Sequence, residues 1–232
     1  MSHEYKATGV LFSGGLDSAV LAAQAAREGA VRTLYISVGF AWEAEERAMA
    51  ARLFSRPPFA GHVDPPVELA FDMRDVFPPD YWAVRGVAPA FDTPDEDVYL
   101  HGRNIILLSK AAVYMAAALS KQHVRVMRLL MGQLAGNPFP DATPAFLAAT
   151  ATSLSLGLSM SIEVATPFAS LSKADVIRRG VELGVPLELT LSCMQPRGGL
   201  HCGRCSKCRE RRDAFRQAGV IDPTRYESAP IR

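Results

Sequence analysis

The sequence predicts an α/β fold, a doubly wound parallel sheet, followed by a distinct C-terminal segment. Short apolar segments alternate with longer helical ones along most of the chain, and this pattern favours parallel strands covered by helices on both faces. A glycine-rich turn joins the first strand to the first helix, so ligands are expected beyond the carboxyl ends of the strands. All four cysteines lie together near the C-terminus, which indicates a zinc-bound helical segment there.

The first elements are the clearest. Residues 8–12 are an apolar strand, and the turn that follows opens a helix over residues 19–27 that ends at Gly29. Residues 31–38 are expected to form a second strand and residues 43–54 a second helix. The same alternation then predicts a strand over 67–71, a helix over 104–120, a strand over 124–131, a helix over 144–158 and a strand over 161–165.

The rest of the chain holds one irregular stretch and two more helices. Four prolines interrupt residues 75–97, and an irregular stretch of this length suggests a functional loop. Ser172 followed three residues later by Asp175 is typical of a helix N-terminus, so we expect a helix from there to Gly184. A basic helix is expected over residues 206–218.

Composition is that of a compact enzyme. The 232 residues are 49% hydrophobic and 21% charged, enough for one sizeable core. The net charge of +1 provides no global field to recruit nucleic acid or a membrane. Residues 1–6 lack the apolar region of a signal peptide, and no apolar run reaches transmembrane length. We therefore expect a cytoplasmic protein without a membrane or nucleic-acid partner.

The turn after the first strand is the strongest functional signal. Its glycines let the backbone approach a ligand closely, while free N–H groups and the helix dipole favour an anion. Asp17 stands where it can cap the helix or face a metal ion. Neither the lysine-containing P-loop pattern nor G-x-G-x-x-G is present, and the alternative is an ordinary strand-to-helix turn. The candidate nucleotide-binding residues are Phe12, Ser13, Gly14, Gly15, Leu16, Asp17 and Ser18.

The second signal is the cysteine pattern C-x8-C-x2-C-x2-C, formed by Cys193, Cys202, Cys205 and Cys208. Two-residue spacings aim neighbouring thiolates at one point, as tetrahedral Zn²⁺ requires, and four thiolates leave no open position for catalysis. We therefore expect a structural zinc. Disulfides would need an oxidising compartment. An iron–sulfur cluster is the more serious alternative, although the cysteine–proline pair usual in ferredoxins is missing.

The order Ser-Gly-Gly-x-Asp-Ser resembles the pyrophosphate loop of the ATP pyrophosphatases, or PP-loop enzymes. Together with the cysteines, the chain resembles the 7-cyano-7-deazaguanine synthase family of queuosine biosynthesis over nearly its whole length. Further matching segments are residues 103–104, 171–177, 180–186, 190–193 and 201–205. The resemblance implies an adenine nucleotide alpha hydrolase-like fold, with a PP-loop domain over residues 1–186 and a four-cysteine zinc segment over residues 187–232 packed on it.

The resemblance also implies a reaction. These enzymes adenylate 7-carboxy-7-deazaguanine with ATP and Mg²⁺, form an amide with ammonia, and dehydrate it to the nitrile; known members are homodimers. The loop would take the pyrophosphate, and Asp17, Lys173 and Arg103 are the candidate catalytic residues. Without the resemblance, Lys173 would be a solvated lysine after an N-cap, and Arg103 could pair with an acidic neighbour.

Departures from the family fall where the acceptor should be bound. Residues 38–42 replace an Asp-Tyr-Gly-Gln stretch, His101-Gly102 replaces Pro-Ala, and Ala135 stands in place of an aspartate that would suit the N–H donors of a purine-like ring. Two alternatives therefore stay open. One is a paralogue that adenylates another carboxylate, or stops at the amide or another conjugate. The other is a zinc-stabilised nucleotide-binding protein without turnover.

Polar residues around the cysteines have two interpretations each. His201 could be a fifth metal donor, but with four cysteines present a structural role is preferred. The neighbouring cations could form a nucleic-acid-binding surface, as in a tRNA thiolation enzyme. The preferred interpretation is that their positive charges offset the negative charge of a zinc–tetrathiolate centre. These cations are Arg197, Arg204, Lys207, Arg209, Arg211 and Arg212.

Overall fold

The computed structural model describes residues 7–228, so the expectation about residues 1–6 lies outside the described chain. At its centre is a five-stranded sheet of order β3-β2-β1-β4-β5 in which every neighbouring pair is parallel. The predicted doubly wound parallel sheet is confirmed. The strands are β1 (Thr8–Leu11), β2 (Arg32–Ser37), β3 (Val67–Ala70), β4 (Val126–Leu130) and β5 (Ser161–Ala165).

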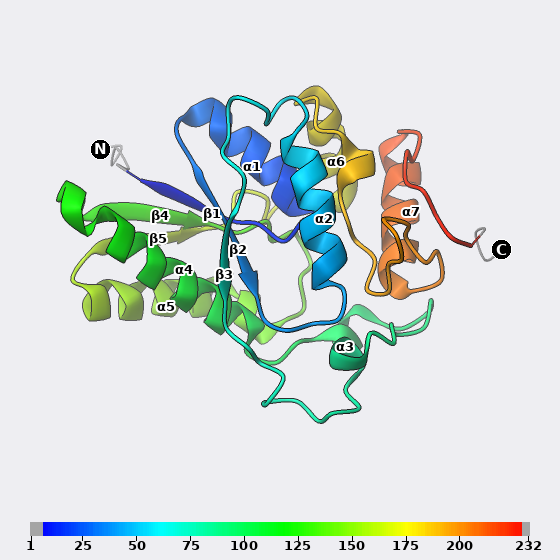
Figure 1. Ribbon diagram of the computed structural model, residues 1–232, viewed down its shortest axis with the longest axis horizontal. Helices are drawn as coiled ribbons and strands as arrows, with labels where there is room; N and C mark the ends of the chain where they lie inside the picture. Colours follow the sequence, from blue (N-terminus) through cyan, green and yellow to red (C-terminus); the bar gives the residue numbers. More distant parts are fainter. Residues whose placement is uncertain (1–6, 229–232) are drawn as a thin grey trace.

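Helices cover both faces of the sheet (Figure 1). One layer contains α1 (Leu16–Glu28), α2 (Glu43–Phe54) and α6 (Lys173–Glu182), and the other contains α4 (Arg103–Leu119) and α5 (Pro144–Leu158). The last helix, α7 (Ser206–Ala218), contacts α6 at the edge of the molecule. Each helix expected from the sequence is present. The first begins earlier than expected because Gly15 is its N-cap, so half of the predicted loop is the first helical turn.

Local side-chain bonds fix the helix starts that matter for the site. At α6, Ser172 Oγ accepts the Asp175 N–H at 3.2 Å and the Ser172 N–H donates to Asp175 Oδ2 at 2.9 Å, which confirms the predicted cap. At α4, the cap comes from a distant residue, because Asp141 Oδ2 accepts the Asn104 N–H at 3.1 Å. These bonds place Lys173 and Arg103 in the first turns of their helices.

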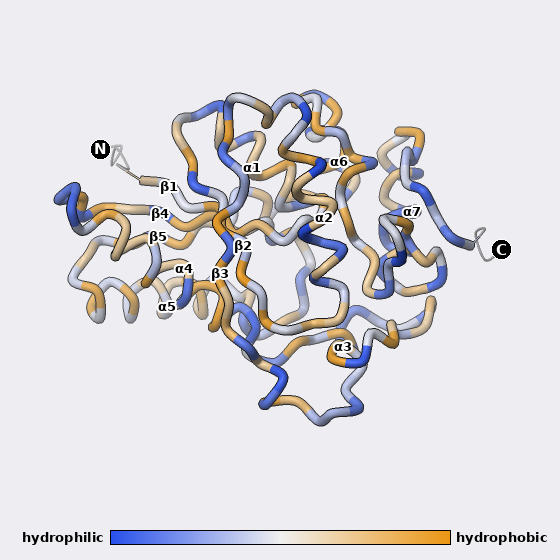
Figure 2. Tube along the Cα trace, viewed as in Figure 1, coloured by the Kyte–Doolittle hydropathy of each residue, from blue (hydrophilic) through white to orange (hydrophobic). Residues whose placement is uncertain are grey.

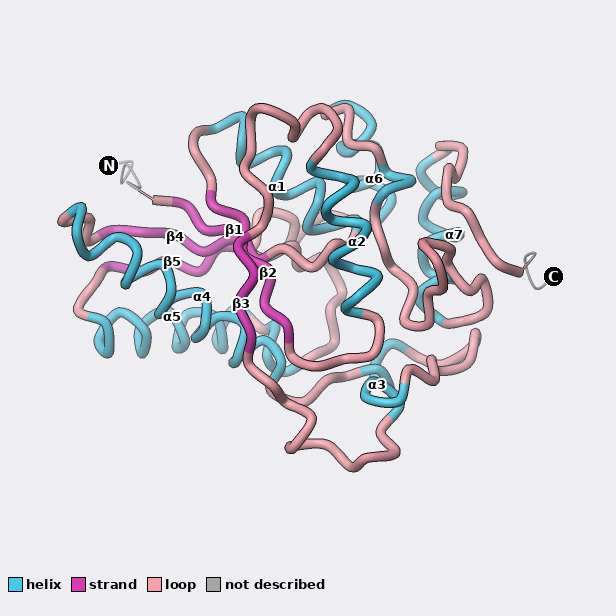
Figure 3. The backbone as a smooth tube through the Cα atoms, viewed as in Figure 1, coloured by secondary structure: helices cyan, strands magenta, loops and turns pink. Residues whose placement is uncertain are grey.

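The segment between β3 and α4 is mostly loop, as predicted (Figure 3). It also contains two short helical turns, α3 (Trp82–Arg85) and a 3₁₀ turn (Asp95–Val98). The sequence pattern did not indicate α3 because tertiary packing stabilises it. Trp82 stacks on Trp42 with ring centroids 5.6 Å apart, and the Ala41 N–H donates to the carbonyl of buried Ala83 at 3.0 Å.

Two apolar clusters fill the space on either side of the sheet. One joins β-strand residues such as Leu34 and Leu129 to α4, and the four cysteines are continuous with it. The other joins Val10 and Tyr35 to α1 and α6. Figure 2 shows α4 and α5 mostly in hydrophobic to neutral colours. Among the described residues, no helix is both long and apolar enough to cross a membrane.

Candidate active site and metal centre

A cavity of about 360 Å³ opens at the carboxyl edge of the sheet. Strands β1 and β4 are neighbours in the sheet, but the chain continues from β1 into α1 on one face and from β4 toward α5 on the other. Open α/β sheets bind ligands at such a switch point. The cavity wall includes Asp17, Lys173 and Arg103, the three candidate catalytic residues. Of the seven candidate nucleotide-binding residues, all but Gly14 line it. The structure therefore brings the predicted residues together.

The turn between β1 and α1 is closed by its two serines. Ser18 Oγ accepts the Ser13 N–H at 3.2 Å, donates to the Gly15 carbonyl at 3.0 Å and lies 3.3 Å from Ser13 Oγ. Gly15, the N-cap of α1, supplies no side-chain cap. The first N–H groups of α1 are therefore left for an anion, as the sequence predicted.

Two glycines allow the backbone around this turn to pack closely. Gly14 has φ +74°, and a Cβ there would lie 3.2 Å from the carbonyl oxygen of Glu46 on α2. Gly132, which follows β4, lies so close to the turn that a Cβ would meet the Asp17 carbonyl carbon at 3.1 Å and the Ser18 nitrogen at 3.2 Å. Both positions therefore need glycine for a steric reason.

Lys173 is held between two carboxylates. Its Nζ lies 3.4 Å from Asp17 Oδ2 and 2.5 Å from Glu210 Oε1, and Glu210 Oε2 accepts a bond from Lys207 Nζ at 2.9 Å. Lys207 also reaches Asp95 Oδ1 at 3.0 Å. This chain joins α1, α6 and α7 to the 3₁₀ turn of the long loop. Lys173 is thus a partly buried, paired cation and not a solvated one.

Burial and neighbouring charges determine the ionisation of this group. Burial alone would lower the pKa of Lys173, but Asp17 and Glu210 outweigh it and raise the pKa. Burial would likewise raise the pKa of Glu210, yet Lys173 and Lys207 lower it to about 2. Burial raises the pKa of Asp17. The lysine and Glu210 therefore carry full charges at neutral pH, whereas a further cation would favour the ionised form of Asp17.

Asp17 has the free oxygen that a Mg²⁺ site needs. Its Oδ1 is buried without a hydrogen-bond partner, while Oδ2 faces Lys173. Carboxylate oxygens are the ligands that Mg²⁺ prefers, usually with substrate phosphates completing the shell. Asp17 therefore fits the expected metal ion better than it fits the alternative role of helix cap, which the structure does not give it.

Arg103 lies in the first turn of α4 and lines the cavity. Its Nε is buried without a partner, and its charge opposes the rise in the pKa values of Glu46 and Asp141. A guanidinium with an unsatisfied donor on a cavity wall can bind a phosphate or carboxylate oxygen. The positive charge of Arg103 acts on the acidic groups Glu46 and Asp141, but its Nε donor stays without a partner.

The wall away from the phosphate turn is aromatic. Trp42 and Trp82 form one stack, and Tyr99 and Phe139 form a second with ring centroids 5.2 Å apart. Such a wall suits a flat heteroaromatic ligand. Ala135 is exposed and does not line the cavity.

Several side chains of the site were not predictable from the sequence pattern. Glu46 and Tyr35 line the cavity and Lys207 enters it from α7, with Glu210 behind. Glu46 lies in an acidic helical run, and Glu210 in a strongly charged one, patterns that usually indicate a solvated face. Only knowledge of how the helices pack could have identified them.

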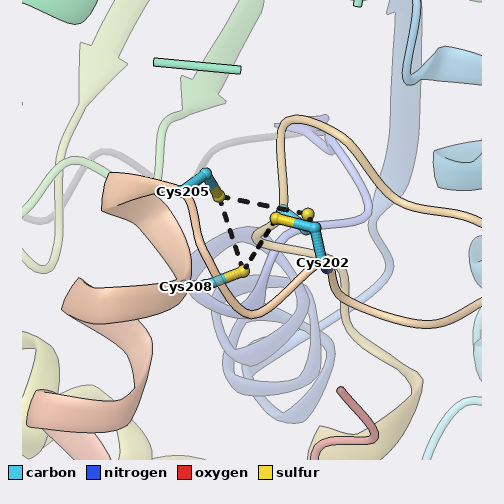
Figure 4. A group of neighbouring side chains, drawn as sticks. Cys202, Cys205 and Cys208 are labelled. Atoms are coloured by element: carbon cyan, nitrogen blue, oxygen red, sulfur yellow. Dashed lines mark hydrogen bonds between the residues drawn. The ribbon is translucent and has the colours of Figure 1, made fainter. Parts of the chain in front are cut away.

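The four cysteines converge as predicted. All four are buried, their Sγ atoms lie within 4.8 Å of one another, and no disulfide joins them. The Sγ atoms are 3.4 Å apart for Cys205 and Cys208, 3.9 Å for Cys202 and Cys208 and 4.0 Å for Cys193 and Cys205, on either side of the separation of about 3.8 Å that Zn–S bonds of about 2.3 Å give in a tetrahedron. Figure 4 shows Cys202, Cys205 and Cys208 turned toward a common centre. An iron–sulfur cube needs its ligands farther apart, because each binds a different iron.

Backbone donors and neighbouring helices support this centre. Cys193 Sγ accepts N–H groups from Gln195 at 3.3 Å and Cys202 at 3.2 Å. Cys205 is the N-cap of α7 and Cys208 lies in its first turn. A metal ion bound here would therefore fix the start of the helix that carries Lys207 and Glu210.

His201 and the nearby arginines act as internal braces. His201 is not among the four clustered ligands; its Nε2 accepts the Ser192 N–H at 3.1 Å, and burial lowers its pKa to about 3. Arg211 is fully buried and donates to Thr190 Oγ1 and to the Leu187 carbonyl. Arg212 lies over the Tyr226 ring. The structural interpretation of His201 is thereby supported.

Comparison with known proteins gives consistent matches. Residues 85–219 match the family described as queuosine biosynthesis protein QueC, and residues 4–127 match the family described as asparagine synthase. The 7-cyano-7-deazaguanine synthases of Azoarcus sp. (strain BH72) and Anaeromyxobacter dehalogenans (strain 2CP-C) are both 34% identical to this chain. The matches cover 94% of this chain and, respectively, 96% and 94% of those proteins. A solved structure of NMN synthetase from Francisella tularensis has 17% identity and a TM-score of 0.46, covering 96% of this chain and 81% of that one.

Proposed function

The chain belongs to the 7-cyano-7-deazaguanine synthase family, as its two motifs predicted, and we propose that it converts 7-carboxy-7-deazaguanine to 7-cyano-7-deazaguanine with ATP and ammonia. The observation that carries this proposal is the assembly of the phosphate turn, Asp17, Lys173 and Arg103 around one cavity. A turn with free N–H groups, two cations and a metal-binding carboxylate is what adenylation by ATP requires.

We assign the phosphate turn to the β and γ phosphates of ATP. Asp17 would hold Mg²⁺, which supplies positive charge to the phosphates. Lys173 and Arg103 would stabilise the charge that develops as the substrate carboxylate attacks the α phosphate and pyrophosphate leaves. Adenylation gives the carboxyl carbon a good leaving group, so that ammonia can displace AMP. Repeating the activation on the amide oxygen leads to the nitrile.

We place the deazaguanine ring against the aromatic part of the cavity wall. The stacks of Trp42 with Trp82 and of Tyr99 with Phe139 match the flat shape of a fused heteroaromatic ring. Residues 38–42, which depart from the family pattern, contribute one of these tryptophans. The departure thus supplies an aromatic surface on the acceptor side.

We propose that the four cysteines hold one structural Zn²⁺ per chain. The zinc segment, residues 187–232, would form one unit with the PP-loop domain over residues 1–186, because α7 contacts α6 and the buried cysteines continue the main apolar cluster. Four reduced thiols, with no disulfide among them, suit the cytoplasm, where we propose that the enzyme works.

We propose that the enzyme is a homodimer that pairs through the outer surface of α4 and α5. Val113 on α4 is 53% exposed and Leu156 on α5 is 78% exposed. Large exposed apolar side chains on adjacent helices are typical of an interface between protein chains. Replacing Leu156 with glutamate should shift the sedimentation of the protein from dimer to monomer; an unchanged sedimentation coefficient would exclude this surface.

The experiment that tests the function uses purified protein with ATP, Mg²⁺, ammonium and 7-carboxy-7-deazaguanine. Pyrophosphate release is followed with time and the products are identified by mass. We expect a product with the mass of the nitrile. A product that stops at the amide would indicate a paralogue. Absence of pyrophosphate release with a panel of deazapurine carboxylates would reject the deazaguanine assignment.

A further inference from the structure

Within residues 7–228, three carboxylates line the cavity, and two of them already have a role. Asp17 faces Lys173 and the phosphate turn. Asp141 caps α4, because its carboxylate oxygens lie 3.1 Å from the Asn104 nitrogen and 3.3 Å from Asn104 Nδ2. The third, Glu46, neither caps a helix nor pairs with a lysine.

Glu46 is held rigidly beside the phosphate turn. It lies on α2, is 7% exposed, and its Oε2 accepts the Tyr35 hydroxyl at 2.7 Å. Its backbone packs against Gly14 so closely that a Cβ on the glycine would lie 3.2 Å from the Glu46 carbonyl oxygen. The position of the carboxylate is thus fixed relative to the turn that would hold the ATP phosphates.

The charged groups around Glu46 suit proton transfer near neutral pH. Burial raises the pKa of Glu46 to about 7, opposed first by the positive charge of Arg103 on α4 and then by the Tyr35 hydroxyl on β2. Glu43, one turn earlier on α2, adds to the rise. Arg47 lies over the Tyr35 ring, 5.9 Å from its centroid. Both ionisation states of Glu46 are therefore accessible at neutral pH.

We infer that Glu46 is the general base that removes a proton from the ammonia nitrogen when it attacks the adenylated carboxyl group. This inference rests on the proposed function. The C–N bond forms, the bond from the carboxyl carbon to the AMP oxygen breaks with its electron pair going to AMP, and the nitrogen loses one proton to the Glu46 carboxylate. In the second round, adenylation of the amide oxygen releases pyrophosphate and one N–H proton to solvent, which gives a neutral imidate. The imidate then loses AMP, which takes the electron pair of the C–O bond, and its remaining N–H proton to the same carboxylate, which leaves the C≡N bond.

The neighbouring groups are less suited to this role. Asp17 must keep its charge for the metal ion, and Lys173 occupies its Oδ2. Tyr35 is the donor in its bond to Glu46, and burial raises its pKa, so the phenol stays protonated. Asp141 accepts from Asn104 through both oxygens. Glu46 is the lining carboxylate that can accept a proton without disrupting the phosphate site or a helix cap.

The test separates adenylation from the step that uses ammonia. In Glu46→Gln the amide keeps an oxygen acceptor for the Tyr35 hydroxyl but cannot take a proton. Without ammonium, we expect pyrophosphate release in the first turnover within about threefold of the unmodified enzyme. With saturating ammonium, amide formation should fall at least about a hundredfold, the usual lower range for loss of a general base. Glu46→Asp should recover part of the rate.

The pH profile and a control complete the experiment. The unmodified enzyme should show an acidic limb near pH 7 in the ammonia-dependent step, measured at constant free ammonia, and Glu46→Gln should lack it. Glu68→Gln, whose side chain is 67% exposed and lies outside the cavity lining, should match the unmodified enzyme. A higher KM for the carboxylate with unchanged amide formation at saturation would show that Glu46 recognises the substrate, and would overturn the inference. An inactive unmodified enzyme would instead reject the proposed function.

Discussion

The ammonium group of Lys173 is held by Glu210, whose Oε1 lies 2.5 Å from Nζ. The two residues come from different helices, α6 and α7, and the second helix begins at the cysteine cluster. Glu210 does not itself line the cavity but contacts the lining residue Lys173, so it acts on the site through that lysine and is a positioning residue. Glu210 thereby links the helix that begins at the cysteine cluster to the proposed ATP site.

Glu210→Gln should weaken the interaction with Lys173 without releasing the metal ion from the cysteine site. The glutamine amide keeps one oxygen acceptor for Lys173 Nζ but carries no negative charge. The attraction of the lysine to Asp17 is then no longer balanced by Glu210, so the ammonium group should shift toward Asp17. We expect pyrophosphate release to fall about tenfold in kcat, with little change in KM for the carboxylate and full zinc content. Asp95→Asn, which removes a partner of Lys207 and leaves the Lys173 bonds intact, should have a smaller effect. Equal losses in the two variants would contradict this role for Glu210.

Asp17→Asn should leave the fold intact and remove turnover. Asparagine keeps the size of the side chain but loses the charge that Mg²⁺ requires. We expect at least about a hundredfold loss in the rate of pyrophosphate release, equivalent to about 2.7 kcal/mol of transition-state stabilisation. Asp213→Asn, on an exposed ion pair of α7, is the matched control and should keep full activity. Near-normal turnover in Asp17→Asn would remove this residue from the catalytic set.

The sequence predicted the sheet and its helices well because both depend on local pattern. The apolar alternation marks buried strands, and the pairing of Ser172 with Asp175 is a local contact that fixes the start of α6. The phosphate turn and the cysteine spacing were recognisable for the same reason, since each motif lies within a short stretch of chain.

Residues brought to the site by packing between distant elements were not predictable. Glu46 and Glu210 look like solvated helical glutamates until α2 and α7 are placed against the cavity and against Lys173. At Ala135, the position along the chain suggested a place in the acceptor site, whereas the fold leaves this side chain exposed. A sequence position fixes which residue is present, while its orientation depends on the fold around it.

Cys205→Ser should release the metal ion and destabilise the C-terminal segment. One tightly bound zinc per chain is expected in the unmodified protein, and its binding free energy contributes directly to folding. Because Cys205 is the N-cap of α7, loss of the ion should also loosen Glu210 and Lys173. Elemental analysis and thermal melting are the measurements; Asp213→Ser on the same helix is the control. Iron with sulfide, or a metal-free protein of unchanged melting temperature, would refute the zinc assignment.

Glu46→Gln should alter how stability depends on pH. Burial raises the pKa of Glu46 from 4.5 to about 7 in the folded protein, so the folded state binds an extra proton between these values. Its contribution to the free energy of unfolding is fully present below pH 4.5 and is lost as the pH rises to about 7. In the glutamine variant, residue 46 does not titrate, so it adds no such pH dependence to the free energy of unfolding.

The stability of the unmodified protein relative to Glu46→Gln should therefore fall by about 2–3 kcal/mol between pH 5 and pH 8, since each pH unit contributes about 1.4 kcal/mol. Urea unfolding of both proteins at the two pH values measures the difference, and other titrating groups cancel in the comparison. Glu68→Gln, at an exposed position, should show no such change relative to the unmodified protein. If the difference between the unmodified protein and Glu46→Gln is independent of pH, Glu46 is ionised in the folded state throughout this range. It would then be a fixed negative charge facing Arg103, with too low a proton affinity to serve as the base.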